Sequence, residues 1–181
     1  MTGGLIALLA SPFPALAEEE IDQQLVALLR STIAQADSFE DRFDAEVWLM
    51  AKSSQLEKYI PDDRERLDLL RKIHRAATRA ELSPEIVLAV IQIESRFDPY
   101  AVSRAGAQGL MQVMPFWKKE IGREEDHLIQ VDTNLRYGCT ILKYYLDRED
   151  GNLTPALARY NGSYGKNWYP ELVLVAWDYW R

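Results

Sequence analysis

Ser-Pro-Glu-Ile-Val-Leu-Ala-Val-Ile-Gln-Ile-Glu, residues 83–94, predicts the central helix of this protein. Ser83 is a typical N-cap, Pro84 fits the first helical position, and Glu85 complements the positive end of the helix dipole. The apolar residues that follow leave no wholly polar face, which indicates a helix buried on all sides. We expect this helix to stop shortly before Pro99.

Glu94 closes the apolar run. Counting back three, four and seven residues places Ile91, Val90 and Val87 on its side of the helix, so its carboxyl group should project from apolar surroundings. Burial and the negative end of the helix dipole both disfavour the charged carboxylate. A pKa raised by about two units would leave part of the carboxyl protonated near neutral pH, as a general acid requires. This environment is typical of a catalytic acid that acts on glycosidic bonds.

The rest of the chain also has helical periodicity and few alternating β-branched runs, so the predicted fold class is all-α. Residues 21–36 and 43–60 carry helical patterns, and Pro61-Asp62-Asp63 supplies a break and a cap for a third helix. His74 lies in that third helix beside its apolar stripe. We assign residues 18–80 to an N-terminal helical extension and residues 81–181 to the main domain.

Composition limits the function classes. The 181 residues are 48% hydrophobic and 27% charged, which suits one globular domain. A net charge of -7 argues against nucleic acid as a partner. The longest apolar run beyond the N-terminus, Leu172–Trp177, is far too short for a transmembrane helix. We expect a monomer.

The first seventeen residues carry no charge and resemble a secretory signal peptide. A short apolar run is followed by Ala15-Leu16-Ala17, the small residues that a signal peptidase requires. We therefore expect cleavage after Ala17, and a periplasmic protein without a lipid anchor. The alternative is an apolar tail on a cytosolic protein.

Cofactor sites are not indicated. Cys139 is the single cysteine, so no intramolecular disulfide can form, and its pattern suits a buried apolar residue better than a nucleophile. The two histidines, His74 and His127, do not lie in a zinc-binding pattern. We expect neither a metal nor a cofactor.

Several segments after Glu94 suit a ligand cleft. Gly109 lets a backbone approach a ligand closely, Gln112 can hydrogen-bond an acetamido group, and Tyr160 ends a short helix in a polar turn. The candidate substrate-binding residues are Ser95, Ser103, Met111, Gln112, Met114 and Asn161.

These motifs resemble those of the soluble lytic transglycosylases, which cleave the glycan strands of bacterial peptidoglycan. The resemblance covers roughly residues 82–170 and lies in Glu94-Ser95, Ser103 with Gly106-Ala107, Gly109-Leu110-Met111-Gln112 with Pro115, Asn134 with Gly138, Tyr145-Leu146, and Tyr160-Asn161-Gly162. Each motif alone is weak, but their common order and spacing are specific. The resemblance implies a lysozyme-like helical fold.

The resemblance also implies a mechanism with one catalytic carboxyl group. Glu94 would protonate the β-1,4 bond between N-acetylmuramic acid and N-acetylglucosamine, and would then deprotonate the muramoyl 6-hydroxyl. That hydroxyl attacks its own C1 and leaves a 1,6-anhydro end. By motif position, Ser103, Gln112 and Met114 would line the central subsite, Tyr160 would orient Glu94, and Asn161 would hold the turn that presents Tyr160.

Three alternatives remain open from the residues alone. Glu94 could reach solvent, or pair with Arg96 or Arg104. If Asp98 faced the cleft as a second carboxylate, lysozyme-type hydrolysis of the same bond would be favoured, although its Asp-Pro context is typical of a turn. A non-catalytic glycan-binding module could stack sugars on aromatic residues such as Trp117, Tyr164 and Trp168.

Overall fold

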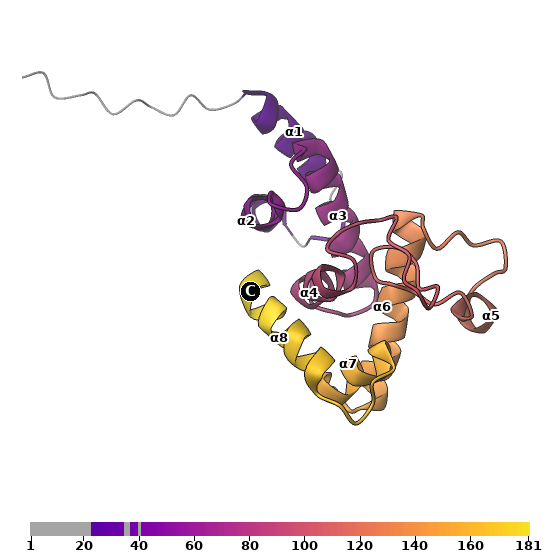
Figure 1. The fold of residues 1–181 in the computed structure, drawn as a ribbon. Helices are drawn as coiled ribbons and strands as arrows, with labels where there is room; N and C mark the ends of the chain where they lie inside the picture. Colours follow the sequence, from indigo (N-terminus) through magenta and orange to yellow (C-terminus); the bar gives the residue numbers. More distant parts are fainter. Residues whose placement is uncertain (1–22, 35–36, 40) are drawn as a thin grey trace, which may run out of the picture.

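A computed structural model describes residues 23–34, 37–39 and 41–181. Over these residues the chain forms eight helices and no strands (Figure 1), and its β-type pairing is limited to isolated bridges at Gln108. The all-α prediction is therefore confirmed. The expected signal peptide, residues 1–17, lies outside the described residues.

The helices follow one another along the chain with short connections, except for a long irregular segment on either side of α5. They are α1 (Gln23–Ala34), α2 (Arg42–Leu56), α3 (Asp63–Arg79), α4 (Pro84–Glu94), α5 (Trp117–Ile121), α6 (Val131–Arg148), α7 (Leu153–Asn161) and α8 (Trp168–Trp180).

Helix α4 is the buried centre of the fold, as its sequence predicted. Ser83 caps it through Oγ, which accepts from the Glu85 amide at 3.2 Å. Residues 86–91 are all buried. Its main partner is α8, whose Trp180 is fully buried and donates from Nε1 to Gln92 Oε1 at 2.8 Å.

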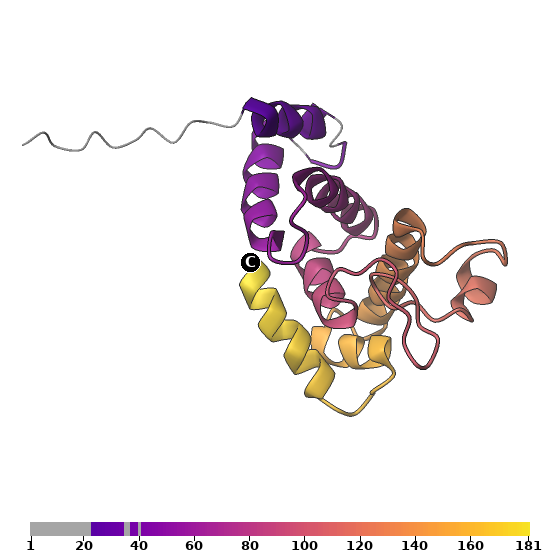
Figure 2. The ribbon, with the colours of Figure 1, turned by 45° about the horizontal axis from the view of Figure 1, so that its top comes forward.

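Helices α6 and α8 flank α4, and α7 joins them at one end of the molecule (Figures 1 and 2). Gly162 ends α7 in the left-handed conformation, with φ of 76°, which an L-residue adopts at a cost. The chain can therefore turn sharply from α7 toward α8. This arrangement brings the C-terminal end of α4, the end of α7 and the start of α8 together.

The N-terminal helices pack on one another and on the main domain. Asp62 caps α3 by accepting from the amides of Arg64 and Glu65, each at 2.9 Å, which matches the predicted break and cap. The preceding helix ends at Leu56, four residues earlier than expected. The amides of Tyr59 and Ile60 both bond back to the Leu56 carbonyl and form a turn there.

The C-terminal end of α8 also lies close to α2 (Figure 2), and side chains of α2 bond to it. The buried Lys52 ammonium donates to the Trp180 carbonyl. Gln55 Nε2 donates to the Tyr179 carbonyl at 2.7 Å, and Tyr179 donates back to the Gln55 carbonyl at 3.1 Å. These bonds satisfy carbonyl groups that a helix end leaves without intrahelical partners.

His74 of α3 flanks the core, as predicted. Its ring stacks on Phe39 at a centroid distance of 3.5 Å, and its Nδ1 lies 2.8 Å from Ser38 Oγ. Burial lowers the pKa of His74 to about 4. Among the described helices, none is both long and apolar enough to cross a membrane.

Candidate active site

Glu94 is the last residue of α4, and the backbone reverses immediately after it. Ser95 follows as the cap, and its Oγ donates to the Ile91 carbonyl at 3.2 Å. Arg96 and Phe97 then adopt φ of 54° and 68°, in the left-handed region that non-glycine residues seldom occupy. Phe97 is buried and packs against Trp180, with ring centroids 5.6 Å apart. This anchored turn ends the helix five residues before Pro99.

The Glu94 carboxyl group is largely buried and bonded to a tyrosine. Burial raises its pKa from 4.5 to about 7, although the Tyr169 hydroxyl, which donates to Glu94 Oε1 at 2.6 Å, acts in the opposite direction. Val87, Val90 and Ile91, which were expected to lie on its side of α4, are fully buried. The carboxyl group is therefore partly protonated near pH 7, as its sequence position predicted.

Tyr169 comes from the first turn of α8 and is itself buried. The sequence did not indicate Tyr169, and the family motifs implied that Tyr160 would orient Glu94. The Tyr160 hydroxyl instead donates to the Met111 carbonyl at 2.7 Å. Burial raises the pKa of Tyr160, and the negative charge of Glu94 adds to this shift. No sequence spacing links Tyr169 to Glu94, since their contact joins two helices through the tertiary fold.

Ser103 and Gln112, two of the candidate substrate-binding residues, lie in the irregular segment before α5. Ser103 is exposed, and its Oγ accepts from the Ala107 amide at 3.0 Å, which tightens a turn. Gln112 has φ of 48°, and its Nε2 donates to the carbonyls of Ala101 and Gly109 at 3.1 and 2.9 Å. In the structure both side chains shape this segment.

Met111 does not line a surface. Its side chain is fully buried, and it occupies the space that a Cβ on Gly138 of α6 would need, at 2.4 Å from Sδ. Its amide donates to Oδ1 of the buried Asn134 at 2.8 Å. Asn134 also donates from Nδ2 to the Leu128 carbonyl at 2.8 Å and so ties two loops to α6. The Met111 side chain, proposed from the sequence as a substrate-binding residue, is therefore buried in the core beneath this segment.

The remaining candidates lie at the surface of the same region. Met114 and Asn161 are half-buried. Asn161 is the final residue of α7 and precedes the left-handed Gly162, so it belongs to the turn that follows Tyr160. Met114 follows two residues after Gln112 in the segment that Asn134 holds.

The structure bears on two alternatives for the acidic residues: an ion pair between Glu94 and an arginine, and a second cleft carboxylate at Asp98. Among the described residues, Glu94 makes no ion pair within 4 Å, so neither Arg96 nor Arg104 neutralises it. Asp98 is exposed, and its Oδ1 accepts from the Tyr100 amide at 2.8 Å, which is the turn geometry that its sequence suggested.

The described part of the chain contains no cluster of three or more histidine, cysteine or acidic residues that could hold a metal ion. Cys139 is buried, and burial raises the pKa of its thiol to about 12, as expected for an apolar core residue.

An all-helical domain with a proton-bearing glutamate at the end of its central helix has the architecture of lysozyme-like proteins. Comparison with solved structures supports this fold. The 70 kDa soluble lytic transglycosylase SLT70 of Escherichia coli matches 87% of this chain with a TM-score of 0.54, at 19% identity, over 30% of its own length. The predicted lysozyme-like fold is confirmed.

The family described as "Transglycosylase SLT domain" matches residues 71–170, and the chain belongs to this family. The transglycosylase of Enterobacteria phage PRD1 is 34% identical over 108 residues, which are 56% of this chain and 40% of that protein. The membrane-bound lytic murein transglycosylase C of Actinobacillus pleuropneumoniae (strain L20) is 33% identical over 126 residues, 64% of this chain and 34% of that protein. The chain thus spans well under half the length of these relatives.

Proposed function

We propose that this protein is a peptidoglycan lytic transglycosylase in which Glu94 acts first as a general acid and then as a general base. The observation that carries the proposal is the Glu94 carboxyl group, which burial brings to a pKa of about 7 beside the Tyr169 hydroxyl. A pKa near the working pH suits a group that must give and then take a proton. Membership of the transglycosylase family supports the same reaction.

In the proposed reaction, Glu94 protonates the oxygen of the β-1,4 bond as that bond to C1 of N-acetylmuramic acid breaks. The resulting carboxylate then removes the proton from the 6-hydroxyl of the same sugar while that oxygen bonds to C1. A 1,6-anhydro end results, and no water is consumed. Tyr169 is bonded to Oε1, which leaves Oε2 for these proton transfers.

Tyr169 is proposed as a positioning residue for this reaction. Its hydrogen bond fixes the rotamer of Glu94 and stabilises the carboxylate that forms after the first proton transfer. Tyr160 supports the site through the Met111 carbonyl, and Ser95, Ser103, Gln112, Met114 and Asn161 remain the proposed contacts to the glycan.

A second catalytic carboxylate is not part of the proposal, because the exposed Asp98 carboxylate is bonded to the backbone of its own turn. A hydrolase would add water to the cleaved bond, whereas a transglycosylase would not. Fragments from digested sacculi that are lighter by one water than hydrolytic fragments would support the transglycosylase, and fragments of hydrolytic mass would support a lysozyme-type enzyme.

Glu94→Gln should lower the release of anhydro fragments at least about a hundredfold, the lower range for a lost general acid. Glu85→Gln, at the opposite end of the same helix, is the matched control and should leave release unchanged after correction for the folded fraction. If Glu94→Gln digested sacculi at the wild-type rate, Glu94 would have no part in the mechanism. A protein that bound glycan strands without any cleavage would instead be a binding module.

We further propose that the protein acts outside the cytoplasm as a monomer, after cleavage of residues 1–17. Residues 18–80 would form the N-terminal extension and residues 81–181 the catalytic domain. Peptidoglycan as the substrate and the names of the murein transglycosylase relatives support an extracytoplasmic location.

A further inference from the structure

Helices α3 and α6 enclose a groove of about 450 Å³ that lies apart from the helices around Glu94. Four cationic residues line it: Lys72, Arg75 and Arg79 from α3, and Arg136 from α6. We call it the basic groove. The Glu94 carboxyl group, in contrast, is held between α4 and α8.

The charge of the basic groove is opposite to that of the whole chain, which is -7. Asp132 is its one acidic lining residue and pairs with Arg75 at 2.9 Å, while Lys72 pairs with Asp68 at 2.7 Å and lies 3.9 Å from Asp132. Arg79, in the last turn of α3, is exposed and makes no ion pair within 4 Å of any residue that the structure describes. Since Lys72, Arg75 and Arg136 are each paired with an aspartate, Arg79 is the groove cation left for an anionic ligand to neutralise among the described residues.

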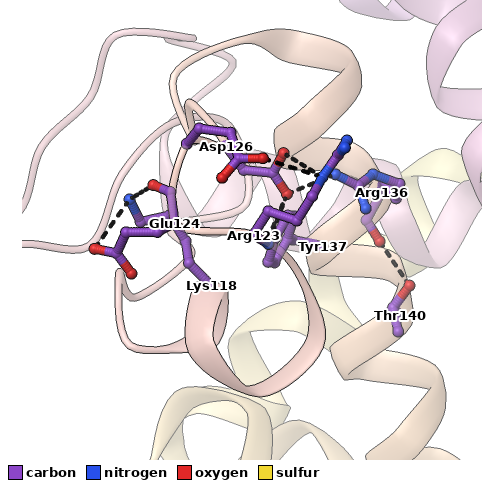
Figure 3. Close-up of polar contacts among 8 residues, drawn as sticks. Lys118, Arg123, Glu124, Asp126, Arg136, Tyr137 and Thr140 are labelled. Carbon is purple, nitrogen blue, oxygen red and sulfur yellow. Dashed lines mark hydrogen bonds and ion pairs between the residues drawn. The ribbon is translucent and has the colours of Figure 1, made fainter.

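Helix α6 contributes one cation, Arg136, whose side chain makes an ion pair. Figure 3 shows Arg136 beside Asp126, and the two groups lie 3.0 Å apart. Asp126 accepts a further hydrogen bond of 2.6 Å from Tyr137, and Thr140 Oγ1 donates to the Arg136 carbonyl at 2.8 Å. Asp126 thus orients the Arg136 guanidinium and also pairs with its charge.

The remaining lining residues are apolar except for Thr140 of α6, which is exposed. Ala76 and Ala80 come from α3, and the buried Leu135 and Cys139 come from α6. Since burial raises the pKa of Cys139 to about 12, the thiol stays neutral at physiological pH. A purely ionic polymer would gain nothing from this apolar floor. A short peptide with small apolar side chains and free carboxylates would use both the floor and the cations.

We propose that the basic groove binds the carboxylate-bearing peptide stems that branch from the glycan strands of peptidoglycan. The choice of this peptide rests on the proposed function, whereas the preference for an acidic peptide rests on the groove itself. Binding of stems here would hold the protein on the cell wall while Glu94 acts on a strand nearby. Because the wall presents many stems, even weak individual binding would raise the residence time.

The test measures binding of the isolated stem peptide to the full chain. Arg79→Glu should raise its dissociation constant about tenfold or more, as expected when one charge-assisted contact is lost and a like charge is introduced. Arg148→Glu is the matched control, because Arg148 is also an exposed arginine in the last turn of its helix but lies outside the groove. It should leave binding within about twofold of wild type. Arg79→Gln provides a milder variant if the charge reversal perturbs folding.

Equal binding by wild type and both Arg79 variants would overturn the proposal, as would an equal loss in Arg148→Glu. It would also fail if amidation of the peptide carboxylates did not weaken binding, or if a glycerol phosphate oligomer bound more tightly than the peptide. Cleavage of peptide-free glycan strands tests the proposed function separately and should be unchanged in Arg79→Glu. Cleavage without peptide binding would remove only the groove proposal, and peptide binding without cleavage would remove only the enzymatic one.

Discussion

Replacing Glu94 by glutamine should stabilise the protein at alkaline pH. Glutamine keeps an oxygen that can accept from Tyr169 but has no buried charge to desolvate. The folded-state pKa of Glu94 is about 7 against 4.5 for an ordinary glutamate. Wild-type stability from this group is therefore complete below pH 4.5 and is lost as the pH rises through 7. The difference between the two pKa values corresponds to about 3 kcal/mol.

Thermal unfolding followed by circular dichroism between pH 4 and pH 8 measures this effect. Other groups titrate in both proteins, so the gap between the two melting curves isolates Glu94. Relative to its value at pH 4, the gap should grow by roughly 6–12 °C in favour of Glu94→Gln at pH 8. A gap that did not change with pH would refute the raised pKa.

Glu85 lies on the same helix and is a useful control, because its pKa is lowered and its effect on stability should have the opposite pH dependence. Hydrogen bonds from Ser83 and Trp48 help to lower its pKa against the effect of burial. Its contribution to stability is present above the unfolded-state pKa and is lost as the pH falls through the folded value. Glu85→Gln should therefore be less stable than wild type at neutral pH, and the difference should narrow in acid.

Three further outcomes follow from the geometry. Tyr169→Phe removes the hydrogen bond that lowers the pKa of Glu94, so under the proposed mechanism the alkaline limb of kcat/KM should move to higher pH while the fold survives. Gly109→Ala should lower the free energy of unfolding by roughly 2–4 kcal/mol, because φ is 72° and the new Cβ would lie 2.5 Å from Asn134 Nδ2. Gly165→Ala, with φ of 82° and open space, should cost only about 1 kcal/mol, and equal losses in chemical denaturation would contradict the crowding. His74→Gln should flatten the loss of stability between pH 6.5 and pH 4, since the pKa of His74 is about 4; an unchanged slope would assign that loss to other groups.

The start of α4 and the environment of Glu94 could be predicted because both depend on neighbours in sequence. Ser83, Pro84 and Glu85 carry local capping chemistry, and the apolar periodicity that follows identifies the face on which Glu94 lies. The raised pKa then follows from burial alone. Rules based on neighbouring residues were therefore enough to predict the burial and the raised pKa of Glu94.

The partner of Glu94 could not be predicted by the same rules. Tyr169 reaches it only because α8 packs along α4, and the sequence analysis assigned that role to Tyr160. The left-handed turn at Arg96 and Phe97 was not predicted either, because it also depends on a tertiary contact. Nothing local favours two consecutive left-handed residues, and the burial of Phe97 against Trp180 compensates their cost of roughly 1–3 kcal/mol each.

The hydrogen bond between Tyr169 and Glu94 joins residues 75 positions apart, and that between Trp180 and Gln92 joins residues 88 positions apart. Contacts of such long range form late, because a large loop must close before they can be made. During synthesis, α4 leaves the ribosome well before the segment that covers it. Its apolar surface is then open to aggregation or to chaperones, and the contact between Tyr169 and Glu94 forms only when the last helix docks.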